Sequence, residues 1–134
     1  MLNAAIYLRH AMSKKRLFEL SLFDPENTLL SLLEKREIVF EKAPVTRDFV
    51  VAMDETIDVL VGDDRESLIE NLVEIFLEWL SLKPHRKVQA QLVDGSIVYI
   101  MHDKNVNEII NILKITLKIT AFDPQYNNQI LNKH

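Results

Sequence analysis

The sequence of 134 residues contains no cysteine and only two glycines, Gly62 and Gly95. Without cysteine there is no disulfide, no thiolate zinc site, no iron–sulfur cluster and no cysteine nucleophile. Two glycines this far apart cannot form a glycine-rich loop that cradles the phosphates of a nucleotide. The sequence therefore leads us to expect no cofactor, no metal site and no catalytic residue.

Long apolar runs are also missing, because no stretch approaches the roughly 18 apolar residues that cross a bilayer. The N-terminus is apolar at Met1 and Leu2, and its positive charges follow at Arg9 and Lys14. A secretory signal has the opposite order. We therefore expect a cytoplasmic protein that does not bind membranes.

What remains is an ordinary globular composition, with 48% apolar residues, 27% charged residues and a net charge of −4. A chain of this length and balance is typical of one domain. We expect a single α+β domain over residues 1–122, followed by a polar C-terminal tail over residues 123–134. The acidic net charge gives no global attraction to nucleic acid.

Hydrophobic periodicity and turn residues predict the order of elements. We expect two helices, three short strands, a long helix, a two-stranded hairpin and a last helix, with a small, mainly antiparallel sheet of about five strands packed against the helices. The predicted ranges are helices at 3–15 and 25–36, strands at 37–42, 47–53 and 56–61, a helix at 63–82, a hairpin at 86–102 and a helix from 103. Residues 17–23 and 114–121 fit either a strand or a helix, and the pattern favours a helix that continues to about Thr116.

The hairpin has the most specific local pattern. Asp94-Gly95 is typical of a two-residue turn of type I′. Pairing outward from this turn places Leu92 opposite Ile97, Ala90 opposite Tyr99 and Val88 opposite Met101. All six side chains would then share one face of the sheet.

The helix predicted from Asp63 to Leu82 has two unusual features. Its apolar residues cover roughly 220° of the helix circumference, whereas a helix on a single core needs about 100°. Burial against the N-terminal helix, or contact with a second chain along Val73, Leu77 and Leu80, would each explain the excess. Its start has a capping-box pattern, with Asp63 followed three residues later by Glu66.

The same helix carries an acidic stripe, Glu66, Glu70, Glu74 and Glu78, spaced by four residues. Like charges at this spacing repel one another weakly. The stripe is either a solvated outer face or a docking surface for a basic partner, including one that normally binds the phosphate backbone of DNA.

Two cationic groups of residues are further candidates. Hairpin pairing gathers His85, Arg86, Lys87, His102 and Lys104 at one end of the sheet, which indicates either an anion site or ordinary exposed charges. The segment Arg9–Arg16 is either a nucleic-acid patch or the basic end of a helix.

The predicted element order resembles that of class I type III secretion chaperones, which are small, acidic and dimeric. The resemblance rests on order and size, and the two helices predicted in the first 36 residues depart from the single first helix of that pattern. It implies an effector segment wrapped in extended form around a dimer.

The residues themselves favour a non-enzymatic protein-binding module, of an inhibitor, immunity or chaperone-like kind. We expect it to be homodimeric and to dock through the helix at 63–82. The alternative is a nucleic-acid-related regulator, which would act as a DNA mimic through the glutamate stripe or as a weak binder through Arg9–Arg16. An enzyme with a site near His85 and His102 is a third hypothesis.

Overall fold

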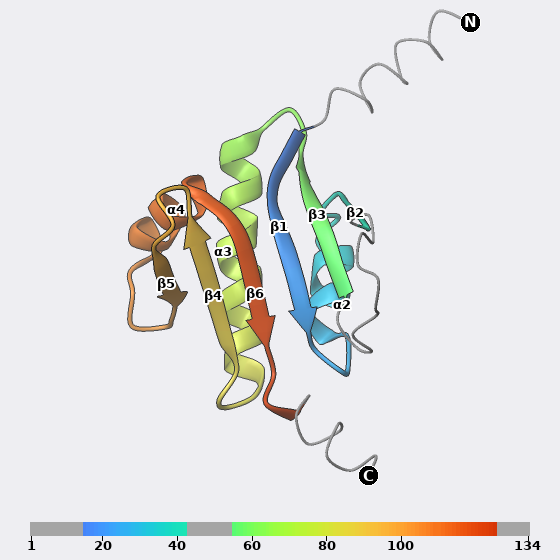
Figure 1. Ribbon diagram of the computed structural model, residues 1–134. Helices are drawn as coiled ribbons and strands as arrows, with labels where there is room; N and C mark the ends of the chain where they lie inside the picture. Colours follow the sequence, from blue (N-terminus) through green and yellow to red (C-terminus); the bar gives the residue numbers. More distant parts are fainter. Residues whose placement is uncertain (1–14, 43–54, 126–134) are drawn as a thin grey trace, which may run out of the picture.

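The computed structural model describes residues 15–42 and 55–125, which form one mixed sheet and three helices (Figure 1). The helices are α2 (Thr28–Lys35), α3 (Arg65–Leu82) and α4 (Val106–Lys114). The strands are β1 (Lys15–Phe23), β2 (Phe40–Lys42), β3 (Glu55–Val61), β4 (Lys87–Leu92), β5 (Ile97–Ile100) and β6 (Thr116–Phe122). The predicted α+β class is confirmed. The helix predicted at 3–15 and the strand predicted at 47–53 fall almost entirely outside the described residues.

The six strands lie in the order β2-β3-β1-β6-β4-β5. The central pair β1 and β6 is parallel, and every other neighbouring pair is antiparallel. All three helices cover one face of this sheet, and the opposite face, toward the viewer in Figure 1, carries no helix among the described residues. The sheet also contains one more strand than the roughly five expected from the sequence.

The core lies between the sheet and α3, which sits between α2 and α4 and contacts both. Phe18 and Leu20 of β1 meet Phe76 and Trp79 of α3, and all four are at most 1% exposed. The rings of Phe18 and Phe76 are 6.4 Å apart. Burial of side chains of this size contributes about 1.5–3 kcal/mol each and dominates the stability of such a domain.

Both ambiguous segments are central strands. Residues 17–23 belong to β1, and β6 begins at Thr116 directly after α4 ends at Lys114. The prediction that this helix continues to about Thr116 was therefore wrong, because α4 ends at Lys114 and Thr116 begins β6. Ile119 and Ala121 are fully buried against the helices, and β6 is paired on both sides, by β1 and by β4. This tertiary pairing outweighs the helical periodicity of the segment.

The predicted hairpin is present, but its register differs by one residue. Val88 pairs with Ile100, Ala90 with Val98, and Leu92 donates to the carbonyl of Ser96 at 2.9 Å. The loop therefore has three residues rather than two, and Gly95 takes the left-handed conformation with φ 89°. A type I turn closed by a left-handed glycine is the usual three-residue hairpin loop.

The observed register changes which side chains of the hairpin share a face. Val88, Ala90 and Leu92 are buried as expected, but Ile97, Tyr99 and Met101 are 49%, 44% and 51% exposed. Successive side chains of a strand point to opposite faces, so a shift of one residue moves Ile97 and Tyr99 to the face without helices, and Met101 directly follows the end of β5.

The long helix begins one residue later than its predicted cap. Asp64, in an extended conformation, accepts a hydrogen bond from the backbone N–H of Ser67 at 3.0 Å, so Asp64 rather than Asp63 is the N-cap. An aspartate there satisfies one of the free amides of the first turn. In the described ranges, no helix has the length and apolar character needed to span a membrane.

Candidate functional site

A buried polar network connects four separate elements behind the sheet. Arg86, directly before β4, has a fully buried side chain whose Nε donates to Asp123 Oδ2 at 3.0 Å. Its Nη1 donates to the carbonyl of Trp79 at 2.8 Å, and its guanidinium lies 4.5 Å from the centre of the Trp79 ring. The arginine thus caps a carbonyl near the end of α3 and joins that helix to the end of β6.

Thr28 completes this network at the start of α2. Its hydroxyl accepts hydrogen bonds from Trp79 Nε1 at 2.9 Å and from Arg86 Nη2 at 3.1 Å, and it donates to the carboxylate of Asp24. One hydroxyl therefore uses its proton and both lone pairs. A cluster in which each group is satisfied in this way stabilises one arrangement of α2, α3, β4 and β6.

The two aspartates of the network occupy equivalent places that the sequence prediction missed. The parallel strands β1 and β6 both end in Phe-Asp-Pro, at Phe23-Asp24-Pro25 and Phe122-Asp123-Pro124. Both aspartates are buried, at 4% and 3% exposure. This repeated tripeptide is the sequence pattern that would have identified them. Asp123, expected at the start of a polar tail, instead forms part of the core.

The apolar circumference of α3 is covered within the chain. Val73, expected on a spare edge, is 1% exposed, while Leu77 and Leu80 are partly buried against the core. The neighbouring helices α2 and α4 provide this cover. The expected contact of Val73 with a second chain is therefore wrong, because the wide apolar arc is buried by α2, α4 and the sheet of the same chain.

The glutamate stripe lies on the exposed side of α3, and α2 supplies a counterion that the helix itself lacks. Arg36 forms ion pairs with Glu74 and, at 4.0 Å, with Glu78. Glu66 and Glu70 are exposed at the other end of the stripe. Exposed ion pairs of this kind contribute about 0–1 kcal/mol to the stability of the fold. Exposed glutamates with weak ion pairs are typical of a helix face that contacts water.

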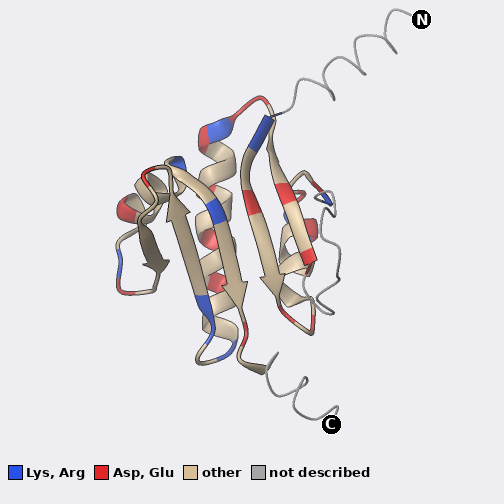
Figure 2. Ribbon diagram, in the orientation of Figure 1, with Lys and Arg blue, Asp and Glu red and all other residues tan. Residues whose placement is uncertain are grey.

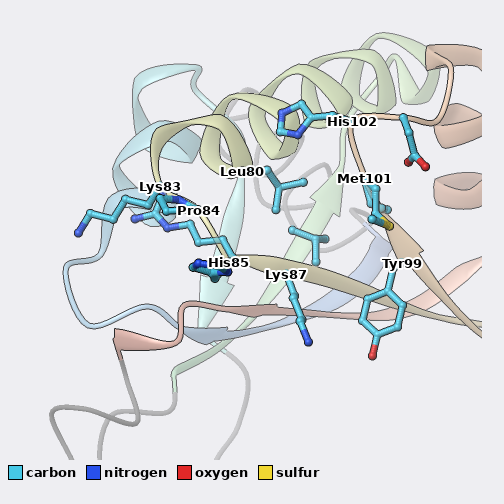
Figure 3. Close-up of a pocket in the computed structure, with 12 residues that line it drawn as sticks. Leu80, Lys83, Pro84, His85, Lys87, Tyr99, Met101 and His102 are labelled. Carbon is cyan, nitrogen blue, oxygen red and sulfur yellow. The ribbon is translucent and has the colours of Figure 1, made fainter.

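The predicted cationic cluster is gathered in part. A cleft of about 760 Å³ is lined by His85, Arg86, Lys87 and His102, together with Lys83 and Asp103. Lys104 is not among the lining residues and lies 3.4 Å from Glu108. Arg86 is paired with Asp123 and Lys83 with Glu26, so Lys87 is the lysine of the cleft without an ion pair among the described residues, beside the exposed imidazoles of His85 and His102 (Figure 3).

The predicted basic segment Arg9–Arg16 is described only at its last two residues. Lys15 and Arg16 begin β1, and Arg16 forms an ion pair with Asp58 of β3 at 3.3 Å. Figure 2 shows this basic end of β1 next to the acidic residues of β1 and β3. In the described part of this segment, Arg16 therefore has an acidic partner on the neighbouring strand.

Several exposed apolar side chains lie at the β5 edge of the sheet. Ile97 and Tyr99 are each about half exposed and occupy alternate positions of β5 on the face without helices, and Met101, 51% exposed, directly follows the strand. Next to them is a hollow of about 310 Å³, lined by Tyr99, Phe23 and Phe122, with Lys87, Gln89 and Thr120. The rings of Phe23 and Phe122 are 6.3 Å apart.

Neither the arrangement of possible metal ligands in the described residues nor the comparison with known proteins indicates a function. Within residues 15–42 and 55–125, no three histidine or acidic side chains are placed to hold a metal ion together. No protein-family model matches the chain, and neither a curated protein sequence nor a solved structure is significantly similar to it.

Proposed function

We propose that this chain is a non-enzymatic protein-binding module that forms a homodimer through the edge strand β5. The observation that carries the proposal is the row of half-exposed apolar side chains, Ile97, Tyr99 and Met101, on that strand and directly after it. We therefore place the docking surface at the edge of the sheet and not on α3, because the apolar side chains of α3 are covered by other elements of the same chain.

The backbone of β5 supports pairing with another strand. β5 is the last strand of the sheet, with β4 on one side and no strand on the other among the described residues. Hydrogen bonding alternates along an antiparallel ladder. Since Val98 and Ile100 face β4, the backbone N–H and C=O groups of Ile97 and Tyr99 point to the open side. Such an edge is a template for an added strand.

A second copy of this chain is the occupant that fits best. Two β5 strands related by a two-fold axis run antiparallel, so the apolar row of one copy lies beside the same row of the other. The acidic hairpin end at Asp94 then approaches the end of the second copy that carries His102. Two hydrogen bonds from Ser96 lower the pKa of Asp94, so this carboxylate is charged at neutral pH.

Light scattering coupled to size-exclusion chromatography tests the proposal. We expect a dimer at high micromolar concentration, and a monomer for Tyr99→Lys and Ile97→Lys. Leu117→Lys is the matched control, because Leu117 is equally exposed, at 51%, but lies on β6; it should remain dimeric. A monomeric wild-type chain, or dimerisation unaffected by the two β5 variants, would overturn the proposal.

A further inference from the structure

We propose that the segment before β1, residues 1–14, packs as an amphipathic helix on an exposed apolar patch at one end of the sheet of its own chain. The patch consists of Val93, Ile115 and Leu117, which are 61%, 47% and 51% exposed. Val93 follows β4, Ile115 precedes β6 and Leu117 belongs to β6. The proposal does not depend on the homodimer, because that interface uses β5.

Backbone contacts bring the three patch residues together. The N–H of Val93 donates to the carbonyl of Ile115 at 2.9 Å. The register of β4 and β6 shifts at Leu92, which pairs with Thr116, so Leu117 is the extra residue of a bulge. Leu92 and Thr116 are buried, at 7% and 4% exposure, and their neighbours in sequence are the three exposed residues. Single exposed apolar side chains are ordinary, but a contiguous group of them indicates a contact site.

The segment joins β1 at the same end of the sheet. β1 and β6 are parallel, so Lys15 and Thr116, their first residues, lie at one end (Figure 1). Lys118 pairs with Glu19. Leu117 therefore lies one strand across and roughly three residues along from Lys15. With about 4.8 Å between strands and about 3.3 Å per residue, this separation is roughly 11 Å.

Residues 1–14 have the length and the sequence pattern to cover the patch. As a helix that rises about 1.5 Å per residue they extend about 21 Å, which exceeds the separation of roughly 11 Å. Helical spacing places Ala5, Leu8 and Met12 on one side of the segment, with His10 and Lys14 on the other. This apolar side needs a surface to bury it, and the apolar arc of α3 is already covered by α2 and α4.

The attachment to β1 favours this segment over a separate partner. A short connection gives a tethered segment an effective concentration in the millimolar range, so it outcompetes a second copy present at micromolar concentration. Docking on the patch removes apolar surface of both partners from water, which is the favourable term. The face of the sheet without helices leaves room for one more helix in the described structure (Figure 1).

A spin label tests the position of the segment. The chain contains no cysteine, so His10→Cys provides a single attachment site on the polar side of the segment. We expect the label to broaden the backbone amide NMR signals of Val93, Ile115 and Leu117 and to leave the signal of Leu82 sharp. Leu82 ends α3 ahead of the start of β4, whereas the patch begins after the end of β4. Sharp signals from all three patch residues in the folded chain would overturn the proposal.

Dilution separates docking within one chain from docking between copies. The spin-labelled chain, enriched in the isotope that NMR detects, is mixed with an excess of chain that has neither label. Broadening that arises within one chain should persist at full strength in this mixture. Broadening that disappears on dilution would place the segment on a second copy and would refute docking on its own chain.

Charged substitutions identify the two contact surfaces. Leu117→Lys in the patch and Leu8→Lys in the segment should each abolish the broadening at Val93 and Ile115, because an apolar contact does not accommodate a charged group. Leu82→Lys is the control, because Leu82 is also exposed, at 55%, but lies outside the patch. Leu8→Lys leaves the described fold unaltered, so it tests the contact even where Leu117→Lys affects folding. Broadening retained in Leu8→Lys, or lost equally in Leu82→Lys, would contradict the assignment.

Discussion

Arg86 and Asp123 form an ion pair closed off from solvent, with Nε and Oδ2 3.0 Å apart and with side-chain exposures of 0% and 4%. Arg86 precedes β4 and Asp123 follows β6, so the pair fastens the ends of two neighbouring strands. Trp79 and Thr28 occupy the other guanidinium nitrogens. The geometry satisfies the conditions under which a buried charge pair is tolerated, since each group retains its hydrogen bonds.

Removing one member of this pair should therefore be costly. Arg86→Ala leaves Asp123 buried without its counterion, and we expect the free energy of unfolding to fall by about 3–5 kcal/mol in chemical denaturation. The control is Arg16→Ala. Arg16 pairs with Asp58 at 3.3 Å but is 54% exposed, so its loss should cost about 0–1 kcal/mol. Similar losses for the two variants would contradict the structural role given to the buried pair.

The glutamate stripe makes a separate prediction. Glu70 has Glu66 and Glu74 four residues away on either side, so Glu70→Lys converts two repulsive neighbours into attractive ones. We expect stabilisation of about 0.4–1 kcal/mol at low salt, which high salt should reduce. Glu74→Lys should show no such gain, because Glu74 pairs with Arg36. Unfolding curves at low and high ionic strength measure both, and destabilisation by Glu70→Lys would show that the carboxylate has a role other than solvation.

The two glycines should respond in opposite ways to alanine. Gly95 has φ 89°, a conformation that an alanine side chain disfavours, and we expect Gly95→Ala to cost about 1–2 kcal/mol. At Gly62 an added Cβ has no atom within 4 Å and φ is not in the left-handed region. Gly62→Ala should therefore be neutral or stabilise by about 0.4–1 kcal/mol through the unfolded chain. Thermal unfolding of both variants checks the three-residue hairpin loop, which predicts this difference.

The carboxylate of Asp94 makes the stability of the hairpin depend on pH in the acidic range. The Ser96 hydroxyl donates to Oδ1 at 2.6 Å and the Ser96 N–H donates at 2.9 Å, and together they lower the pKa of Asp94 below its ordinary value. A lowered pKa means that the ionised carboxylate stabilises the fold above the unfolded pKa, and that this contribution disappears as the pH falls through the folded pKa.

An NMR titration of the Asp94 carboxyl carbon tests this assignment. We expect the pKa of Asp94 to rise toward its ordinary value in Ser96→Ala, because the side-chain hydrogen bond is the largest cause of the shift. Ser81→Ala is a control, since the Ser81 hydroxyl donates to the Glu78 carbonyl, far from the hairpin in sequence. A pKa of Asp94 unchanged in Ser96→Ala would show that another group holds the carboxylate.

Local sequence patterns predicted the elements whose cause is local. The helix after Asp64 has a side-chain cap, and Asp94-Gly95 forms a turn between two strands as expected. Capping and turn formation depend on backbone groups only a few residues away. These features could therefore be derived from the chain alone, within a residue at each boundary.

The cleft could be predicted only in part. Hairpin pairing brought His85, Lys87 and His102 to one end of the sheet, and all three line the cleft. Its apolar floor could not be foreseen, because Leu80 comes from α3 and the predicted register placed Ile100 on the other face of the hairpin. A two-residue and a three-residue loop differ by one position, and that difference decides which side chains face the helices.

The sequence by itself determined that this protein is an α+β domain with a long amphipathic helix and a hairpin, because periodicity, caps and turn residues act over short distances. Only the tertiary structure decided that α2 and α4 cover α3, that residues 116–122 form a strand between β1 and β4, and that Arg36 faces the glutamate stripe. These outcomes depend on contacts between residues distant in the chain, where burial and strand pairing outweigh local preference.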